Sequence, residues 1–192
     1  MPSPVGHALA GVAAGYLAGG AAVGHRESAS HNRLTARKLL SDRRVVVFGL
    51  LGMLPDADFL FGVHSMYTHS IGAIVVVALC GALIGPQKRT QVSMAAAAAY
   101  GSHVLLDWLG SDAVAPIGIM ALWPLTTEFF LSERYWFTSV CREYWLVECW
   151  WHNVFGLIRE LLILGPVALG AVLLTNGLGN RQRSSPETIQ PE

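Results

Sequence analysis

Charged residues are scarce in this chain. Asp, Glu, Lys and Arg make up 14% of its 192 residues, against roughly 25% in an average soluble domain. Acidic and basic residues balance at 13 each, and there is no long basic run, which excludes nucleic acid as an expected partner. The N-terminal apolar run lacks the basic start of a signal peptide, so we expect it to remain as a helix.

Cysteine is also rare. Cys80, Cys141 and Cys149 form no CxxC pair, which argues against a zinc knuckle and against a disulfide framework. A bond between Cys141 and Cys149 needs a loop in an oxidising compartment, and we expect two free thiols instead. No cysteine therefore joins the candidate metal ligands described below.

Apolar segments, in contrast, are abundant. Hydrophobic residues make up 53% of the chain, and they concentrate at about 5–23, 45–54, 71–84, 92–109 and 157–175. A membrane-spanning helix needs about 20 apolar residues; the first, fourth and fifth segments reach this length, whereas the second and third are short. We predict an all-α integral membrane bundle of about five apolar helices, with residues 1–175 as one domain and a disordered polar tail over 176–192.

Three glycines in the first segment, Gly11, Gly15 and Gly19, are spaced four apart. This spacing puts them on one helix face, where small residues allow another helix to approach closely, in membranes especially. A phosphate-binding loop is the alternative, but no strand precedes the glycines and no Lys-Ser/Thr pair follows them. We therefore expect them to serve helix packing.

The basic residues divide the connections between these segments. Most of them lie between the first and second segments, between the third and fourth, and after the fifth, whereas the other side keeps only Arg134, Arg142 and Arg159. By the positive-inside rule, this alternation predicts a multi-pass protein of the inner (cytoplasmic) membrane, with its N-terminus outside and its C-terminus in the cytoplasm. A soluble bundle has no reason to sort its charges in this way.

The connection over residues 110–153 is rich in tryptophan. It carries five of the six tryptophans of the chain, namely Trp123, Trp136, Trp145, Trp150 and Trp151. Indole rings settle where apolar and aqueous surroundings meet. We predict that this connection forms a Trp-rich extracytoplasmic cap at the membrane interface.

Histidines and aspartates gather at the segment ends that face away from the basic connections. One stands at the start of the first segment, four lie between the second and third, and two end the fourth: His7, Asp56, Asp58, His64, His69, His103 and Asp107. Helices that alternate in direction bring all these ends to one face. Ionisable groups in or beside membrane spans are costly and usually mark a functional site.

The spacing of these residues suits a metal ion. His103 and Asp107, in "HVLLD", lie at i and i+4 on one helical face, within reach of one ion. Imidazole with carboxylate is the ligand set of zinc and of other catalytic first-row metals. Each piece also has a structural interpretation: His7 can be an ordinary residue of a helix start, Asp56 a turn residue, and His103 with Asp107 a hydrogen-bonded pair between helices.

Four blocks resemble, in order, those of the YdjM-like inner-membrane proteins, a family regarded as metal-dependent hydrolases. They are "PSPVGHALAGVAAG", "LPDADFLFG", "HSMYTHSIGA" and "HVLLDWLGSDAVAPIGIMALWPL", and they extend over residues 2–125. A more distant likeness is to the zinc-dependent phospholipase C and P1 nuclease group, all-helical enzymes with a zinc cluster. This likeness implies from one to three ions, with these ligands: His7, Asp56, His69, His103 and Asp107, and as weaker candidates Glu148 and His152.

Together these observations predict a membrane-bound metal-dependent hydrolase that uses a divalent metal, Zn²⁺ or alternatively Mn²⁺, at the extracytoplasmic side. A metal ion lowers the pKa of bound water towards ~7 and so supplies hydroxide at neutral pH. Asp58 or His64 is expected to orient a ligand or to act as general base. The expected substrate is a phosphoester or lipid-like amphiphile, such as a phospholipid, that reaches the site from the membrane lipid.

Two other functions would use the same residues. A metal-ion or proton transporter would use them as a binding or relay site, but such sites lie near the bilayer midplane, whereas these residues lie at segment ends. A purely structural protein would use them to tie helix ends together and would bind no metal. We favour the hydrolase over both.

Overall fold

The computed structural model describes residues 1–20, 42–61, 64–85, 88–112 and 114–184, and this part of the chain contains helices and no strand. The elements in chain order are α1 (Pro4–Gly15), a π-helical turn η1 (Tyr16–Gly20), α4 (Arg43–Met53), a 3₁₀ helix η2 (Leu54–Phe61), α5 (Ile71–Ile84), α6 (Arg89–Trp108) and α7 (Val147–Ser184). The predicted all-α class is confirmed. The basic connection predicted after the first segment falls largely on 21–41, outside the described residues.

Side-chain caps fix where three of the helices begin. Ser3 accepts a hydrogen bond from the Gly6 amide at the start of α1, and Pro4 occupies the first helical position. Asp42 caps α4 and Ser70 caps α5 in the same way. The caps hold the first turns of these helices, and with them the side chains that these turns carry.

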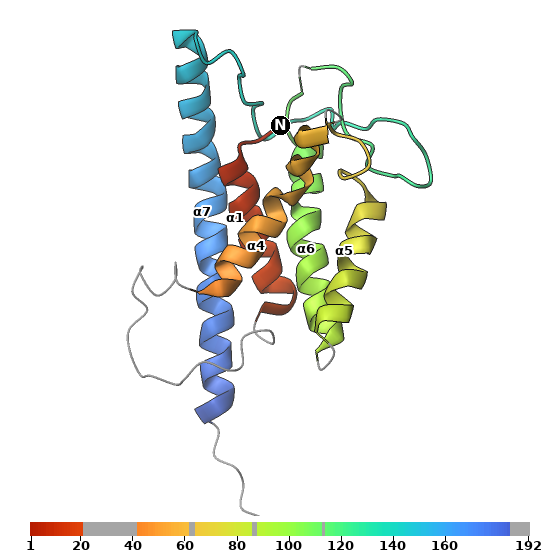
Figure 1. Cartoon of the computed structure of the whole chain (residues 1–192). Coiled ribbons are helices and arrows are strands. Elements are labelled where there is room, and N and C mark those ends of the chain that lie inside the picture. The colour runs from red at the N-terminus through yellow and green to blue at the C-terminus, as the bar shows by residue number, and fades with distance from the viewer. Residues whose placement is uncertain (21–41, 62–63, 86–87, 113, 185–192) are drawn as a thin grey trace, which may run out of the picture.

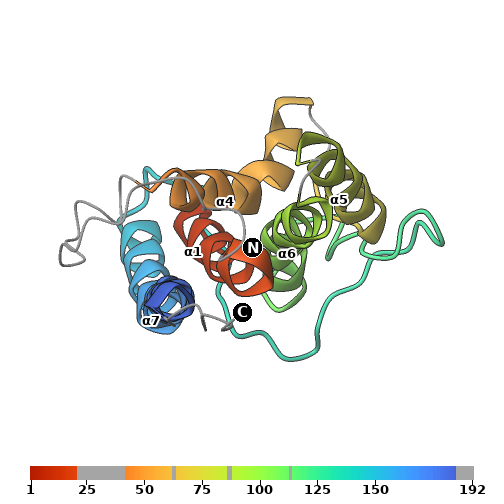
Figure 2. The same cartoon turned by 90° about the horizontal axis from the view of Figure 1, so that it is seen from below.

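Successive α-helices run in opposite directions (Figure 1). The start of α1, the end of α4 with η2, the start of α5 and the end of α6 therefore lie at one end of the molecule, beside the connection that leads to α7. The predicted convergence of these segment ends is confirmed. Viewed along the helices, α1 lies between α4, α6 and α7 and contacts all three, whereas α5 packs against α6 (Figure 2).

Glycines allow α1 to lie this close to its neighbours. A Cβ atom on Gly11 would lie 2.8 Å from the Cα of Gly52 in α4, closer than real Cβ contacts. A Cβ atom on Gly15 would clash with the ring of Phe48, and one on Gly19 with the backbone of α6. The packing interpretation of the glycine stripe is confirmed.

One helix of the described residues is long and apolar enough to cross a membrane. Residues Val147–Asn176 of α7 have a mean hydropathy of 2.1, and only 22% of their most apolar window is buried. The apolar helix α5 is shorter, and the first segment forms an α-helix of 12 residues before η1. The predicted five-span bundle is therefore not established, because α6 has sufficient length but too low a hydropathy.

Large apolar side chains cover the outer faces of two helices. These exposed residues are Val75, Val76, Leu79, Leu83 and Ile84 on α5, and Leu161, Leu162, Leu169, Leu173 and Leu174 on α7. Soluble monomers rarely expose apolar patches of such extent. The two faces are the surfaces that a membrane or another chain would cover.

The chain beyond α6 departs from the sequence prediction in three respects. Helix α7 begins at Val147, so it takes the last part of the predicted cap, and it continues to Ser184, into the predicted disordered tail. Residues 185–192 lie outside the described residues. The expectation of two free thiols was wrong, because Cys141 and Cys149 form a disulfide, with their Cα atoms 5.4 Å apart.

Candidate metal centre

Four side chains from three parts of the chain meet at one end of the bundle. They are Asp56 of η2, His69 just before α5, and His103 and Asp107 of α6. The Nε2 atoms of the two histidines are 3.1 Å apart, and each lies 3.1–3.2 Å from Oδ2 of Asp107. Oδ1 of Asp56 lies 3.7 Å from the His69 Nε2 and 3.5 Å from the His103 Nε2.

The spacing of these four atoms fits a metal ion. In a tetrahedral zinc site whose ligands lie about 2.0–2.1 Å from the ion, neighbouring ligand atoms are about 3.3 Å apart. The separations between 3.1 and 3.7 Å in this cluster are close to that value. Two carboxylates would also balance the charge of one divalent cation, which suits a buried centre.

A backbone carbonyl fixes the orientation of His103. Its Nδ1 lies 2.7 Å from the carbonyl oxygen of Gly52 in α4. A carbonyl oxygen only accepts, so the proton must be on Nδ1 of His103. The lone pair of the neutral ring is therefore on Nε2, which faces the other ligand atoms, as in protein metal sites generally.

A short relay fixes His69 in the same way. Nδ1 of His69 lies 2.9 Å from Oγ1 of Thr68, and this hydroxyl donates to Oδ2 of Asp58 at 2.7 Å. Asp58 also lies 3.3 Å from Nδ1 of His69. Asp58 therefore stands behind the imidazole, on the side away from Asp107, where it orients the ring.

Buried polar atoms in the cluster lack hydrogen-bond partners among the described residues. They are both carboxylate oxygens of Asp107 and the Nδ1 of His7. The Nε2 of His7 lies 3.3 Å from Oδ1 of Asp107, and its ring stacks on that of His103 at 3.7 Å between centroids. A fully buried carboxylate is costly unless its charge is compensated, and a cation between the ligand atoms would supply that compensation.

The electrostatics of the loop residues follow from this arrangement. Although burial opposes it, hydrogen bonds with His103 and His69 lower the pKa of Asp56, and those with His69, His64 and Thr68 lower the pKa of Asp58. Burial acts to lower the pKa of His69, but the carboxylates around it, Asp107 first, raise that pKa to about 11. Without a metal ion, a proton on His69 compensates the carboxylates.

His64 lies at the edge of the cluster. Its Nδ1 is 2.9 Å from Oδ1 of Asp58 and donates a hydrogen bond to that carboxylate, and its Nε2 lies 3.0 Å from the sulfur of Met1. The side chains of His69, His103 and Asp107 have no exposed surface, whereas His64 keeps 18% and Asp56 25%. The centre therefore opens to its surroundings past these two residues.

Two weaker candidates do not join the cluster. His152 is exposed on α7 and its Nε2 lies 2.7 Å from the carbonyl oxygen of Ser139, and Glu148 is also exposed. A separate group of Cys141, Glu143 and Cys149 has metal-like spacing, but its two sulfurs are joined in the disulfide. The described residues thus bring four of the predicted ligands together. His7 packs against His103 and Asp107, and Asp58 and His64 lie directly behind the group.

Glu160 of α7 is a buried acidic residue that the sequence analysis passed over. It is 2% exposed, and both its oxygens accept hydrogen bonds from Ser3, one from the amide at 2.7 Å and one from the hydroxyl. The carboxylate thus caps the N-terminus of α1, where the helix dipole favours negative charge. A glutamate within an apolar segment was the signal that could have revealed it.

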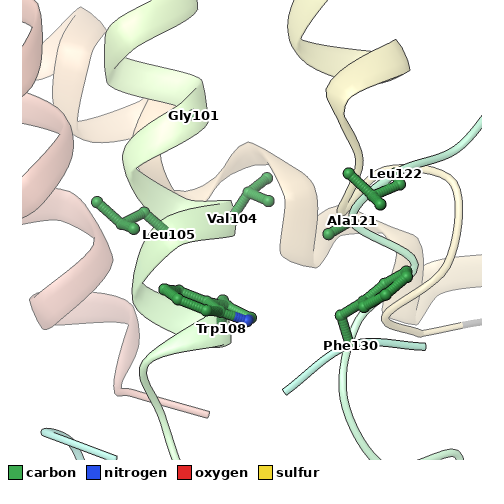
Figure 3. A pocket seen from close by; sticks show the side chains of 7 residues that line it. All are labelled: Gly101, Val104, Leu105, Trp108, Ala121, Leu122 and Phe130. Carbon is green, nitrogen blue, oxygen red and sulfur yellow. The ribbon is translucent and has the colours of Figure 1, made fainter. Parts of the chain in front are cut away.

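An apolar pocket of about 340 Å³ lies on another side of α6. Val104 and Trp108 of this helix face Ala121, Leu122 and Phe130 of the connection across it (Figure 3). No residue of the cluster lines this pocket. The pocket is therefore separate from the centre, although it lies on the same turns of α6.

The fold and the cluster together define an all-helical protein with an apolar candidate span and a His/Asp group that could hold a metal ion. A family model described as YdjM inner membrane protein matches residues 1–181, and the chain belongs to this family. The comparisons with curated proteins and with solved structures gave no match. The likeness to the phospholipase C and P1 nuclease group is not shown by these comparisons and stays a prediction.

Proposed function

We propose that this inner-membrane protein is a metal-dependent hydrolase whose divalent metal, Zn²⁺ in the first instance, is held by Asp56, His69, His103 and Asp107. The observation that carries the proposal is the meeting of two imidazole Nε2 atoms and two carboxylates at 3.1–3.7 Å. Both rings have their other nitrogen bonded outward, to Gly52 and Thr68. Such second-layer bonds are typical of metal-binding histidines.

A divalent metal bound there supplies Lewis acidity, which activates water at neutral pH and stabilises charge on a phosphoester. The chain itself supplies a base. His64 donates an Nδ1–H hydrogen bond to Asp58, so in the neutral ring the lone pair is on Nε2, at the partly exposed edge of the cluster. His64 can accept a proton from water there once Met1, whose sulfur lies 3.0 Å from Nε2, moves aside, while Asp58 positions both His64 and His69.

The site is proposed to face the extracytoplasmic side. Few basic residues belong to this end of the chain, whereas Arg43, Arg44, Lys88 and Arg89 belong to the opposite end. The disulfide that joins Cys141 of the connection to Cys149 of α7 supports the same orientation, because disulfides persist in oxidising compartments such as the periplasm.

The proposed substrate is a phosphoester with an apolar part, and a membrane lipid fits this description. The apolar pocket beside Trp108 suits an acyl chain near the cap. Since no cluster residue lines it, the pocket supports a lipid neighbour and carries no argument about the reacting bond. The failure of Glu148 and His152 to reach the cluster supports a centre of one or two ions over one of three.

A metal-ion or proton transporter is the alternative function. It would need ligands near the middle of a span, on broken helices. The ligands here lie at η2, in a loop and in the last two turns of α6, at one end of the bundle. This position favours an enzyme that works at the membrane surface.

The metal content of the detergent-purified protein tests the proposal. We expect one or two equivalents of zinc, lost in His103→Ala and in Asp56→Asn. His152→Ala is the matched control, because His152 is an exposed histidine outside the cluster and should leave the zinc content unchanged. Asp56 is partly exposed, so its isosteric variant should fold even if the His103 variant does not.

Hydrolysis of a chromogenic phosphodiester by the zinc-loaded protein tests the reaction itself. We expect activity in the wild type and in His152→Ala, and loss of activity in Asp56→Asn. A well-folded wild type that takes up neither zinc nor manganese would overturn the metal centre. Stoichiometric metal without hydrolysis, together with metal uptake into proteoliposomes, would favour the transporter.

A further inference from the structure

An arginine of the connection is linked to the cluster by a row of stacked rings. The guanidinium carbon of Arg142 lies 5.2 Å from the centroid of the Phe59 ring. The Phe59 ring in turn stacks on His64, at 3.7 Å and an interplanar angle of 22°. His64 meets His69 edge to face, at 5.0 Å. The row leads from an exposed cation to a fully buried member of the cluster.

The Met1 amino group beside the cluster is within the electrostatic reach of Arg142. Burial lowers the pKa of the Met1 amino group, and the charge of Arg142 acts in the same direction, whereas Asp107, Asp112 and Asp56 act to raise it. One point beside the cluster therefore senses the arginine and the carboxylates. Phe59 brings Arg142 to the side of the cluster on which His64 lies.

The backbone next to Arg142 is held from two sides. Cys141 is bonded to Cys149 of α7, and Asn153 of the same helix brackets it: the Cys141 amide donates to Oδ1 of Asn153 at 2.8 Å, and Nδ2 of Asn153 donates to the Cys141 carbonyl at 2.9 Å. Such a clamp limits the positions that the next side chain can take. The disulfide and the two hydrogen bonds to Asn153 thus hold Arg142 in its position over Phe59.

The guanidinium itself has no acidic partner among the described residues. Arg142 is exposed and forms no ion pair there, although Asp42 and Arg44 at the other end of the bundle do pair. A stacked guanidinium keeps its N–H donors in the ring plane free for an oxyanion. Arginine binds phosphate and carboxylate groups through two parallel hydrogen bonds.

We propose that Arg142 is the anion-binding residue of this centre and that the ligand it selects carries a phosphate or similar oxyanion. This inference rests on the proposed metal centre and names the charge of its substrate. The purely structural alternative is a cation–π clamp that fixes the connection to η2. The two differ in whether removal of the charge changes anion affinity or only stability.

Binding of inorganic phosphate to the zinc-loaded protein in neutral detergent separates them. We expect Arg142→Gln to weaken phosphate binding about tenfold or more, because a charge-assisted pair of hydrogen bonds is lost, and Arg142→Lys to recover part of the affinity. Arg134→Gln is the matched control, since Arg134 is an exposed arginine of the same connection. It should bind phosphate as the wild type does.

The outcomes separate this proposal from the metal centre. Wild-type phosphate affinity in Arg142→Gln, or no phosphate binding by the wild type, would overturn the proposal even if zinc is present. If the protein takes up no zinc, the metal centre fails, and the same titration on the metal-free protein still decides the role of Arg142. Unchanged zinc content in Arg142→Gln is expected in either case.

The disulfide gives an independent test. If the clamp positions Arg142, the single variant Cys149→Ser should bind phosphate more weakly than the wild type. The same substitution should cause no further loss of phosphate affinity in the Arg142→Gln variant. Additive effects in the double variant would contradict the positioning role.

Nanodiscs identify the source of the oxyanion. In discs of phosphatidylglycerol, a bound headgroup should reduce the apparent phosphate affinity of the wild type but not of Arg142→Gln. Discs of phosphatidylcholine provide the reference. An unchanged affinity in both would identify a free anion as the ligand of Arg142.

Discussion

His103 donates an Nδ1–H hydrogen bond to the carbonyl oxygen of Gly52, 2.7 Å away on a different helix. The same glycine lets α1 approach α4, because a Cβ atom on Gly52 would lie 2.9 Å from the Cα of Gly11 and would clash with the His7 carbonyl. One residue without a side chain therefore sets both the tautomer of a candidate ligand and the distance between two helices that meet at the centre.

Gly52→Ala should consequently damage the centre. We expect the variant to push α1 away from α4, to lower the thermal midpoint and to weaken zinc binding by about 10- to 100-fold, the usual cost of disturbing a second-layer partner. Gly49→Ala is the control on the same helix, since the nearest atom to its Cβ is at 3.8 Å. Thermal denaturation and chelator competition measure the two effects; equal zinc affinity in both variants would refute the argument.

Asp58 is expected to act through His69 and His64. Asp58→Asn keeps the shape but removes the charge that faces Nδ1 of His69 at 3.3 Å. We expect zinc affinity to fall about 10- to 100-fold with little change in fold. Glu128→Gln, an exposed carboxylate of the connection, is the control and should bind zinc as the wild type does. If Asp58→Asn keeps full zinc affinity, the relay through Thr68 has no role in ligand orientation.

The sequence predicted the centre better than it predicted the surroundings. His69, His103 and Asp107 could be grouped from the sequence. When successive helices alternate in direction, the start of one helix and the end of the next lie at the same end of the bundle, whatever the details of packing. The tautomer of His103 could not be predicted, since it depends on a carbonyl 51 residues away. Arg142 was noted only as a charge on one side of the membrane.

The helix lengths and the cysteine pair show the opposite limit. Apolar composition located every helix core but not its ends, because α7 continues through Asn176 and begins ten residues before the apolar segment, at Val147. The disulfide depends on a turn that brings residues eight apart into contact. Neither the ends of α7 nor the pairing of Cys141 with Cys149 produces a periodic pattern in the sequence from which it could be predicted.

Zinc binding should depend on pH through His69. Its pKa is raised to about 11 in the folded protein. The charged ring therefore stabilises the metal-free folded state fully below about pH 6.5, the ordinary pKa of histidine, and this stabilisation is lost as the pH rises through 11. Zinc must displace this proton. We expect about one proton released per zinc between pH 7 and 9, and an affinity that rises about tenfold per unit. Calorimetry in two buffers of different ionisation enthalpy counts the proton, with His152→Ala as reference; pH-independent binding would contradict this.

Glu160 should stabilise the start of α1. Its two hydrogen bonds from Ser3 and its place at the helix N-terminus give a contribution of about 1–3 kcal/mol. Glu160→Ala, which leaves the Ser3 amide without its partner, should lose more than Glu160→Gln, and Glu128→Gln should lose nothing. Unfolding experiments in detergent measure the stabilities of these variants and so test this order. If Glu160→Ala unfolds like the wild type, the buried carboxylate does not hold α1 to α7.

The orientation in the membrane can be tested by cysteine labelling in a Cys80→Ser background, since Cys80 is the free thiol of the described residues. Thr127→Cys reports on the connection over the centre, and Lys88→Cys on the start of α6 at the opposite end. We expect a membrane-impermeant maleimide to label the first but not the second in intact spheroplasts, because the proposed orientation leaves the basic end in the cytoplasm. Permeabilised cells, where both should react, are the control. Labelling from outside at Lys88→Cys alone would place the centre in the cytoplasm and remove the reason for the disulfide, since cytoplasmic thiols are kept reduced.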